Sequence, residues 1–288
     1  MIWTPCERAV GQIELGPFSI PATRSCPVNG RALPLVVMSH GNRGTRFGHF
    51  DTAIALADAG FVAVSFNHPG NSFGNNHAEH SLSVFDSRVM DMRRVIDFVT
   101  TQWSQRGTID NGAIGAFGFS RGGYTVLALA GAVPDLQAAK TRYCNSLVSW
   151  TLPLCWKVRF GNASIRPTPD PRVKAIVAID PLNFFDVAGL TRVTIPVQLW
   201  ASEFGGDGVE PIHVRDVRDG LPPQPEFHLA AGAGHFAFLA PCSPALARDA
   251  PEICNDRDGF DRTAFHRTLN DAVVEFFRRR LGAAASRP

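Results

Sequence analysis

Residues 113–131 read AIGAFGF-SRGG-YTVLALAG, and this stretch decides the fold. Its first seven residues are an apolar run with the length of a buried strand, and residues 122–131 are a run of small and apolar residues suited to a helix packed closely on a sheet. Between them, Gly118-Phe119-Ser120-Arg121-Gly122 fits the pattern G-x-S-x-G. Glycine is needed at both ends because the chain turns sharply there, and the strained turn lifts the serine hydroxyl out of the sheet. The stretch therefore predicts a strand–turn–helix unit that presents Ser120 as a nucleophile.

Short apolar runs alternate with longer segments of helical period on both sides of this unit. Such alternation is typical of a mostly parallel sheet with helices on both faces. The pattern predicts strands at residues 33–39, 61–66, 113–119, 174–179, 197–201 and 226–230, and helices at 50–60, 84–103, 122–131 and 261–281. With 288 residues, 45% of them hydrophobic, the chain can bury one large core. We expect a single α/β-hydrolase domain over residues 1–288.

One segment interrupts the alternation, at about residues 132–172. It is too long for a simple connection inside a compact domain, so we interpret it as a small cap inserted after the nucleophile helix. Trp150 and Trp156 lie in it. We expect both to line the pocket for the acyl or alcohol group; the alternative is that they pack on the cap itself.

The overall composition excludes several classes of function. The net charge is +2 and no basic stripe is visible, so nucleic-acid binding is not expected. No apolar run approaches the roughly 18 residues of a membrane span. No Cys-x-x-Cys occurs, and His77-Ala78-Glu79-His80 has no partner ligands nearby in the sequence, so we expect no metal site.

Six cysteines bear on the compartment. An even number favours disulfides, and pairing nearest neighbours gives Cys6–Cys26, Cys144–Cys155 and Cys242–Cys254. Three bridges would imply an oxidising compartment, so we expect a secreted or periplasmic protein whose export signal is absent from this chain. The alternative is a cytoplasmic protein with scattered buried thiols.

Ser39-His40-Gly41-Asn42 ends an earlier predicted strand. Acyl transfer builds negative charge on the carbonyl oxygen, which two preorganised backbone N–H groups must face. In this fold one N–H belongs to the residue after the nucleophile, here Arg121, and the other to the loop after the earlier strand, for which Asn42 is the candidate. His40, upstream of the serine and next to a glycine, suits a role in shaping this loop.

The candidate general base is His235, in a glycine-rich loop after the last predicted strand. It satisfies the chain order serine, acid, histidine that this fold requires. The acid should follow a strand between Ser120 and His235. Asp207 is the favoured candidate, Asp180 is the alternative, and Glu203 is the third.

Four segments together resemble the platelet-activating-factor acetylhydrolases and the bacterial hydrolases known as predicted dienelactone hydrolases: Ser39-His40-Gly41, Ala59-Gly60-Phe61-Val62, Asn67-His68-Pro69-Gly70-Asn71-Ser72 and Gly118-Phe119-Ser120-Arg121-Gly122-Gly123. The likeness runs from about Leu33 to the C-terminus, apart from the cap. It implies a cofactor-free, often exported esterase with a Ser-His-Asp triad and an N–H pair at Asn42 and Arg121.

The resemblance leaves the acid open. The acetylhydrolase pattern maps onto Asp180, whereas the spacing in the bacterial relatives maps onto Asp207 and Pro211. The chain also departs from true dienelactone hydrolases, which use a cysteine nucleophile where this chain has Ser120.

The sequence thus predicts a serine hydrolase that cleaves carboxylic esters through an acyl-enzyme, with a small-molecule or lipid-like ester as substrate. A phospholipase A2-type acetylhydrolase, a polyesterase and an amidase are alternatives on the same triad, because specificity depends on cap and pocket. A non-catalytic binding protein that kept the fold is a more remote alternative.

Overall fold

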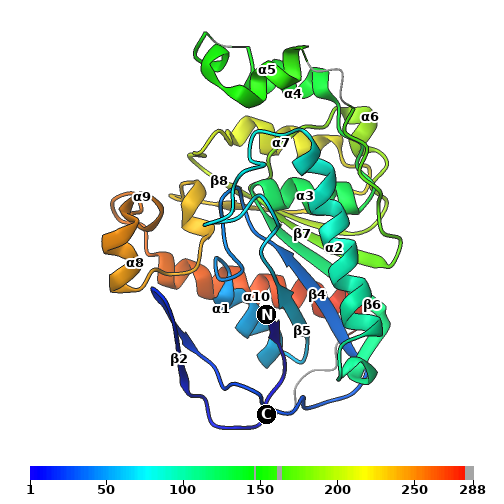
Figure 1. Ribbon diagram of the computed structural model, residues 1–288, viewed down its shortest axis with the longest axis vertical. Coiled ribbons are helices and arrows are strands. Elements are labelled where there is room, and N and C mark those ends of the chain that lie inside the picture. The colour runs from blue at the N-terminus through cyan, green and yellow to red at the C-terminus, as the bar shows by residue number, and fades with distance from the viewer. Residues whose placement is uncertain (146, 161–163, 283–288) are drawn as a thin grey trace.

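The computed structural model describes residues 1–145, 147–160 and 164–282. Its centre is a seven-stranded sheet in the order β1-β5-β4-β6-β7-β8-β9 (Figure 1). β1 pairs antiparallel with β5, and the other neighbours are parallel. The strands are β1 (Ile2–Trp3), β4 (Leu33–Ser39), β5 (Val62–Ser65), β6 (Ile109–Phe119), β7 (Val173–Ile179), β8 (Val197–Ser202) and β9 (Glu226–Ala230), with a separate hairpin of β2 (Gln12–Leu15) and β3 (Phe18–Pro21).

Helices cover both faces of this sheet, as predicted (Figure 1). One core cluster joins the sheet to α2, α3 and α7, and the other joins it to α1 and α10. The helices are α1 (Phe50–Asp58), α2 (Ser83–Thr101), α3 (Arg121–Leu129), α4 (Leu136–Tyr143), α5 (Pro153–Phe160), α6 (Val187–Leu190), α7 (Pro211–Gly220), α8 (Pro244–Asp249), α9 (Pro251–Cys254) and α10 (Arg262–Leu281).

Burial on both faces explains why the central strands are continuous apolar runs. In β4, Leu35 and Val37 belong to one core cluster, and Val36 and Met38 belong to the other. In β6, a Cβ atom at Gly115 would come within 2.6 Å of the Phe277 ring, so glycine lets α10 pack closely on the sheet. These contacts fix the strands whose carboxyl ends carry the candidate site.

The predicted elements and the observed ones agree closely, with one clear extension. β6 begins at Ile109 rather than at residue 113. The apolar run does not reach that far because Asp110, Asn111 and Gly112 are polar or small and are not buried. The short helices α6, α8 and α9 and the strands β2 and β3 were not expected, since four to six residues give no reliable periodicity. The ten-residue helix α7 was not predicted either.

The segment interpreted as a cap contains α4, a 3-10 turn at Val148–Thr151, and α5. It lies at one end of the molecule, beyond α6 and α7 (Figure 1). Residues 146 and 161–163 of this segment lie outside the described part of the chain. The disulfide Cys144–Cys155 joins the end of α4 to α5.

All three predicted cysteine pairs are disulfides in the structure: Cys6–Cys26, Cys144–Cys155 and Cys242–Cys254. Among the described helices, none is both long and apolar enough to cross a membrane.

Candidate active site

Ser120 lies between β6 and α3 in a strained backbone conformation, with φ 57° and ψ −118°. Positive φ is uncommon for a residue with a side chain and is found where the surrounding structure enforces it. Two glycines allow the backbone to pack closely enough to hold Ser120 in this conformation. A Cβ atom at Gly118 would lie 2.1 Å from the Gly122 carbonyl oxygen, and one at Gly122 would lie 2.0 Å from the Ser39 carbonyl oxygen. The turn therefore has the shape expected of a nucleophile-bearing turn.

His235 begins a short 3-10 turn after β9, and its ring is buried against Phe119, the residue before Ser120. Its Nδ1 lies 2.7 Å from Oδ2 of Asp180. A carboxylate only accepts hydrogen bonds, so Nδ1 carries the proton and donates it. That tautomer leaves Nε2 as an acceptor, and Nε2 is buried with no hydrogen-bond partner among the described residues. His235 thus keeps its basic nitrogen available in the way a general base requires.

Asp180 is completely buried and held by Ser202. The backbone N–H of Ser202 donates to Oδ1 at 2.9 Å, and the Ser202 hydroxyl donates to Oδ2 at 2.7 Å. With the bond from His235, the carboxylate accepts three hydrogen bonds. These three hydrogen bonds offset the cost of burying the charged carboxylate of Asp180.

The prediction that Asp207 pairs with His235 is wrong, because Asp180 occupies that position. Asp207 is exposed at the tip of a tight turn in which Gly206 and Val209 exchange backbone hydrogen bonds, each at 2.9 Å. Its φ of 47° fits such a turn. Burial lowers the pKa of Arg121 to about 10, and the charges of Glu79 and then of Asp207 offset part of this effect.

Sheet register explains why Asp180 is the partner. Phe119 of β6 is in register with Ile179 of β7, so the residues that follow them, Ser120 and Asp180, end adjacent strands. Asp207 follows β8, one strand further from β6. Glu203, the third candidate, accepts the backbone N–H of Gly232 at 2.7 Å and so has a structural partner instead.

Asn42 and Arg121, the two expected oxyanion donors, follow β4 and β6 respectively, and these strands are neighbours. Arg121 is the first residue of α3, whose first backbone N–H groups have no intrahelical acceptor. In the described part of the chain, the backbone N–H groups of Asn42 and Arg121 make no hydrogen bond. Both are therefore available to bind an anionic oxygen.

His40 shapes the loop that carries Asn42. Its Nδ1 donates to the Gly41 carbonyl oxygen at 2.7 Å, and its Nε2 accepts the backbone N–H of His68 at 3.2 Å. Burial lowers the pKa of His40 to about 3, helped by the positive charge of Arg88. His40 is therefore neutral at physiological pH, in the loop-shaping position expected from the sequence.

Trp150 and Trp156 pack on the cap itself, and the prediction that they line the substrate pocket is not supported. Their rings meet edge to face at 6.1 Å, and the Arg159 guanidinium lies 4.1 Å above the Trp150 ring. They are 47% and 52% exposed, respectively. The local sequence shows an apolar segment but does not reveal which way its side chains face.

A cavity of about 230 Å³ opens beside His235. Phe204 and Phe236 supply aromatic surface, and the guanidinium of Arg257 lies 3.9 Å above the Phe204 ring. Neither cap tryptophan lines this cavity. Sequence reasoning did not single out these three residues, because they meet only after the loops following β8 and β9 are folded together.

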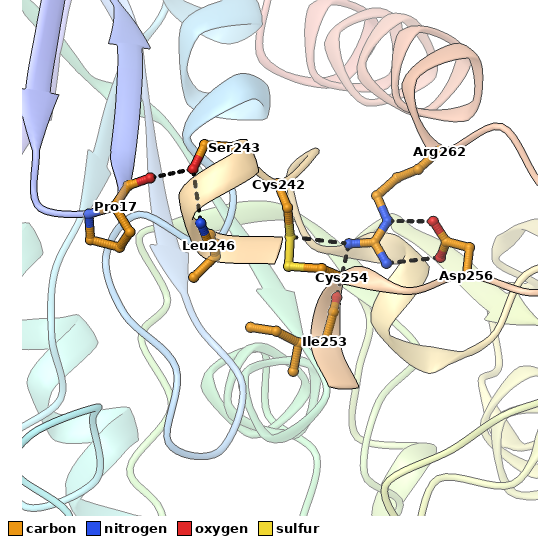
Figure 2. Close-up of a disulfide and its surroundings, with 8 residues drawn as sticks. All are labelled: Pro17, Cys242, Ser243, Leu246, Ile253, Cys254, Asp256 and Arg262. Atoms are coloured by element: carbon orange, nitrogen blue, oxygen red, sulfur yellow. Dashed lines mark hydrogen bonds and ion pairs between the residues drawn. A yellow bond between two sulfur atoms is a disulfide. The ribbon is translucent and has the colours of Figure 1, made fainter. Parts of the chain in front are cut away.

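Figure 2 shows how the segment after His235 is held. Cys242 is bonded to Cys254, and Arg262 at the start of α10 forms two hydrogen bonds of 2.8 Å with Asp256. Arg262 also donates to the Ile253 carbonyl oxygen at 2.9 Å. This wall of the cavity is therefore tied to the closing helix.

No cluster of three or more histidine, cysteine or acidic side chains suited to a metal ion occurs within residues 1–145, 147–160 and 164–282.

The chain is similar to known hydrolases. Residues 20–152 match the Dienelactone hydrolase family. Over 101 residues the chain is 38% identical to a Bis(hydroxyethyl) terephthalate hydrolase of Streptomyces coelicolor, and the match covers 35% of this chain and 28% of that protein. The chain therefore matches less than a third of that relative's length.

Two solved structures share the fold. A ferulic acid esterase from Streptomyces cinnamoneus superimposes with a TM-score of 0.63 at 18% identity, covering 93% of this chain and 74% of that one. An esterase of Pyrococcus furiosus superimposes with a TM-score of 0.52 at 12% identity, covering 86% and 83% respectively. These likenesses confirm the predicted α/β-hydrolase fold.

Proposed function

We propose that the chain, which has the α/β-hydrolase fold, is a serine hydrolase that cleaves carboxylic esters through an acyl-enzyme. One observation supports this most strongly. His235 is hydrogen-bonded through Nδ1 to buried Asp180, and its buried Nε2 has no partner in the described structure. Ser120 lies on a strained turn and directly follows Phe119, whose ring packs against the His235 ring. These are the parts of a Ser-His-Asp triad.

The proposed mechanism follows from this arrangement. Ser120 Oγ attacks the ester carbonyl carbon while His235 Nε2 takes its proton, and Asp180 stabilises the imidazolium. The backbone N–H groups of Asn42 and Arg121 bind the oxyanion. Collapse of the tetrahedral intermediate breaks the C–O bond, and the alcohol leaves with the proton from His235. Water, activated by the same histidine, then hydrolyses the acyl-enzyme.

We propose esters of carboxylic acids that contain an aromatic ring as the first substrates to test. The names of the matched hydrolase and of one structural neighbour denote such esters. The cavity beside His235 is lined by Phe204 and Phe236, whose rings can pack against an aromatic ring of the substrate.

The proposed compartment is an oxidising one, outside the cell or in the periplasm. Three disulfides favour it, because bridges of this kind are rare in reducing cytosol.

The test is hydrolysis of p-nitrophenyl acetate, methyl ferulate and bis(hydroxyethyl) terephthalate by the wild type and by Ser120→Ala. We expect Ser120→Ala to lose about 10⁴-fold or more in kcat, since only the oxyanion hole and binding remain. Ser83→Ala, at an exposed serine of α2, is the matched control and should be fully active. A folded Ser120→Ala protein with a tenth of wild-type turnover would refute the assignment.

A further inference from the structure

A ring of four polar side chains lies next to the proposed oxyanion hole. Nδ2 of Asn71 donates to Oδ1 of Asn42 at 2.8 Å and to Oδ1 of Asn76 at 3.0 Å. On the opposite side of the ring, Nδ2 of Asn42 donates to Glu79 Oε1 at 2.7 Å, and Nδ2 of Asn76 donates to Glu79 Oε2. Three members of the ring come from the loop between β5 and α2, and Asn42 comes from the loop after β4.

The direction of every bond in this ring is fixed by chemistry. The Glu79 carboxylate can only accept, so Asn42 and Asn76 must both turn their amide nitrogens toward it. Their carbonyl oxygens then face Asn71, which must present its own nitrogen to both. Asn71 therefore has no freedom to flip, and its Oδ1 faces the other way.

That oxygen points to the second half of the proposed oxyanion hole. Asn71 Oδ1 accepts from Nη1 of Arg121 at 3.4 Å and from Nη1 of Arg88 at 2.8 Å. Arg121 Nη1 also donates to the Glu79 carbonyl oxygen at 3.2 Å. Asn71 thus contacts the side chains of both residues whose backbone N–H groups are the proposed donors, Asn42 and Arg121.

Arg88 also links the loop of Asn42 to the turn of Arg121, and its side chain is completely buried. It donates to the carbonyl oxygen of His40 in the Asn42 loop. Its Nε also donates at 3.2 Å to the Thr125 hydroxyl, which in turn donates at 2.8 Å to the Arg121 carbonyl oxygen. Arg88 and Asn71 are buried at the centre of these hydrogen bonds, and hydrogen bonds to buried groups give the rigidity that preorganised donors need.

We propose that Asn71 is a positioning residue: its side-chain amide holds the loop of Asn42 and the turn of Arg121 in register, so that their backbone N–H groups converge on one oxyanion. This role rests on the proposed function, because it requires those two N–H groups to act in acyl transfer. Asn71 does not touch the reacting atoms, and its effect passes through Asn42 and Arg121.

The first test replaces Asn71 with aspartate. A carboxylate keeps the bonds from Arg88 and Arg121, but it places an acceptor against the carbonyl oxygens of Asn42 and Asn76 and breaks the ring there. With p-nitrophenyl acetate we expect kcat to fall about 10- to 100-fold, less than the 10²- to 10³-fold loss for removing a donor outright. KM should change by less than about threefold, because the donors act mainly in the transition state.

Asn75→Asp is the matched control. It makes the same chemical change four residues away in the same loop, at an exposed asparagine whose Oδ1 contacts His77 rather than the ring. A trifluoromethyl ketone, which forms a tetrahedral oxyanion on the serine, supplies the second readout. Its inhibition constant should rise by the factor by which kcat/KM falls in Asn71→Asp and stay unchanged in Asn75→Asp.

Reversing the two bonds of Asn42, while those of Asn76 keep their direction, gives a partial rescue experiment. In Asn71→Asp/Glu79→Gln, the Asn42 amide can flip, donate to the carboxylate introduced at position 71 and accept from the amide introduced at position 79. We expect the double variant to be at least about threefold more active than the product of the two single effects predicts. If Asn71→Asp folds poorly, Glu79→Gln still tests the ring, because it retains Asn71. We expect the kcat of Glu79→Gln to be lower than that of the wild type.

Three results would overturn the role of Asn71. These are Asn71→Asp turnover within twofold of Asn75→Asp, an unchanged inhibition constant despite a lower kcat, and purely multiplicative effects in the double variant. In each case wild-type hydrolysis shows that the proposed function stands. A wild-type protein that neither hydrolyses p-nitrophenyl acetate nor binds the ketone would overturn both proposals together.

Discussion

Among single residues, Asp180 has the most demanding environment: it is completely buried, and its carboxylate accepts three hydrogen bonds from Ser202 and His235. An asparagine in its place would present an amide nitrogen to one of these donors. If that nitrogen faces His235, it forces the other tautomer and places the proton on Nε2, where the base must be free.

We therefore predict that Asp180→Asn lowers kcat by about 10⁴-fold while the protein stays folded. Asp207→Asn is the matched control, since Asp207 is exposed at a turn tip, and it should keep kcat within about threefold. Steady-state kinetics with p-nitrophenyl acetate, with circular dichroism for folding, measures both. An inactive Asp207→Asn together with an active Asp180→Asn would reverse the assignment.

The sequence was informative about residues whose roles depend on local patterns. Ser120 is marked by the glycines around it, and His235 by its place after the last strand. The partner of His235 could not be chosen in this way, because the choice depends on which strand lies beside β6. The register that pairs Phe119 with Ile179 is a property of the folded sheet. The roles of Asn71 and Arg88 were likewise invisible, since their partners are distant in the chain.

Among the elements, the segment after His235 is held by both a disulfide and an ion pair. The disulfide Cys242–Cys254 and the Arg262–Asp256 pair tie it to α10 (Figure 2). His235 itself is held by other bonds, namely its backbone N–H to Gly205 at 2.8 Å and its ring to Asp180.

Removing this disulfide should therefore cost stability rather than turnover. We predict that Cys242→Ser/Cys254→Ser lowers the free energy of unfolding by about 2–4 kcal/mol, with kcat at 25 °C within about threefold of wild type. Urea unfolding and steady-state kinetics measure the two quantities. A large loss of kcat in a fully folded variant would show that the bridge positions His235 directly.

The cap could be predicted only in part from the sequence. Its position as an insertion was predicted from its length, but the orientation of its tryptophans was not. Each indole packs on the other and is about half exposed.

We predict that Trp150→Ala and Trp156→Ala leave the relative kcat/KM unchanged across p-nitrophenyl esters from acetate to decanoate. Stability should fall by about 0.5–1 kcal/mol in Trp150→Ala, from loss of the contact with Arg159. A change of more than fivefold in chain-length preference, in stable variants, would show instead that these residues contact substrate.

For the whole molecule, the buried neutral histidines set the response to acid. Burial lowers the pKa of His40 to about 3 and that of His49 to about 4, and it lowers the pKa of His68 well below its usual value. In the unfolded chain these residues titrate near 6.5. Between these values the unfolded state binds more protons than the folded state, so the free energy of unfolding falls as pH falls.

We therefore predict a loss of about 3 kcal/mol between pH 7 and pH 5.5, about 1 kcal/mol for each of these three histidines. This part of the stability is fully present above about pH 7 and is lost progressively on acidification. Urea unfolding at pH 7.0, 6.5, 6.0 and 5.5 measures it. A free energy of unfolding that is constant or rises over this range would contradict the buried, neutral state of these residues.

Activation of Ser120 as a nucleophile is the central claim about the molecule as a whole. The most direct test is reaction of the folded protein with a fluorophosphonate, followed by mass spectrometry of its peptides. We predict one adduct per chain, on Ser120, and none in Ser120→Ala or in heat-unfolded protein. No adduct on the folded wild type, or an adduct on another residue that persists in Ser120→Ala, would contradict the claim.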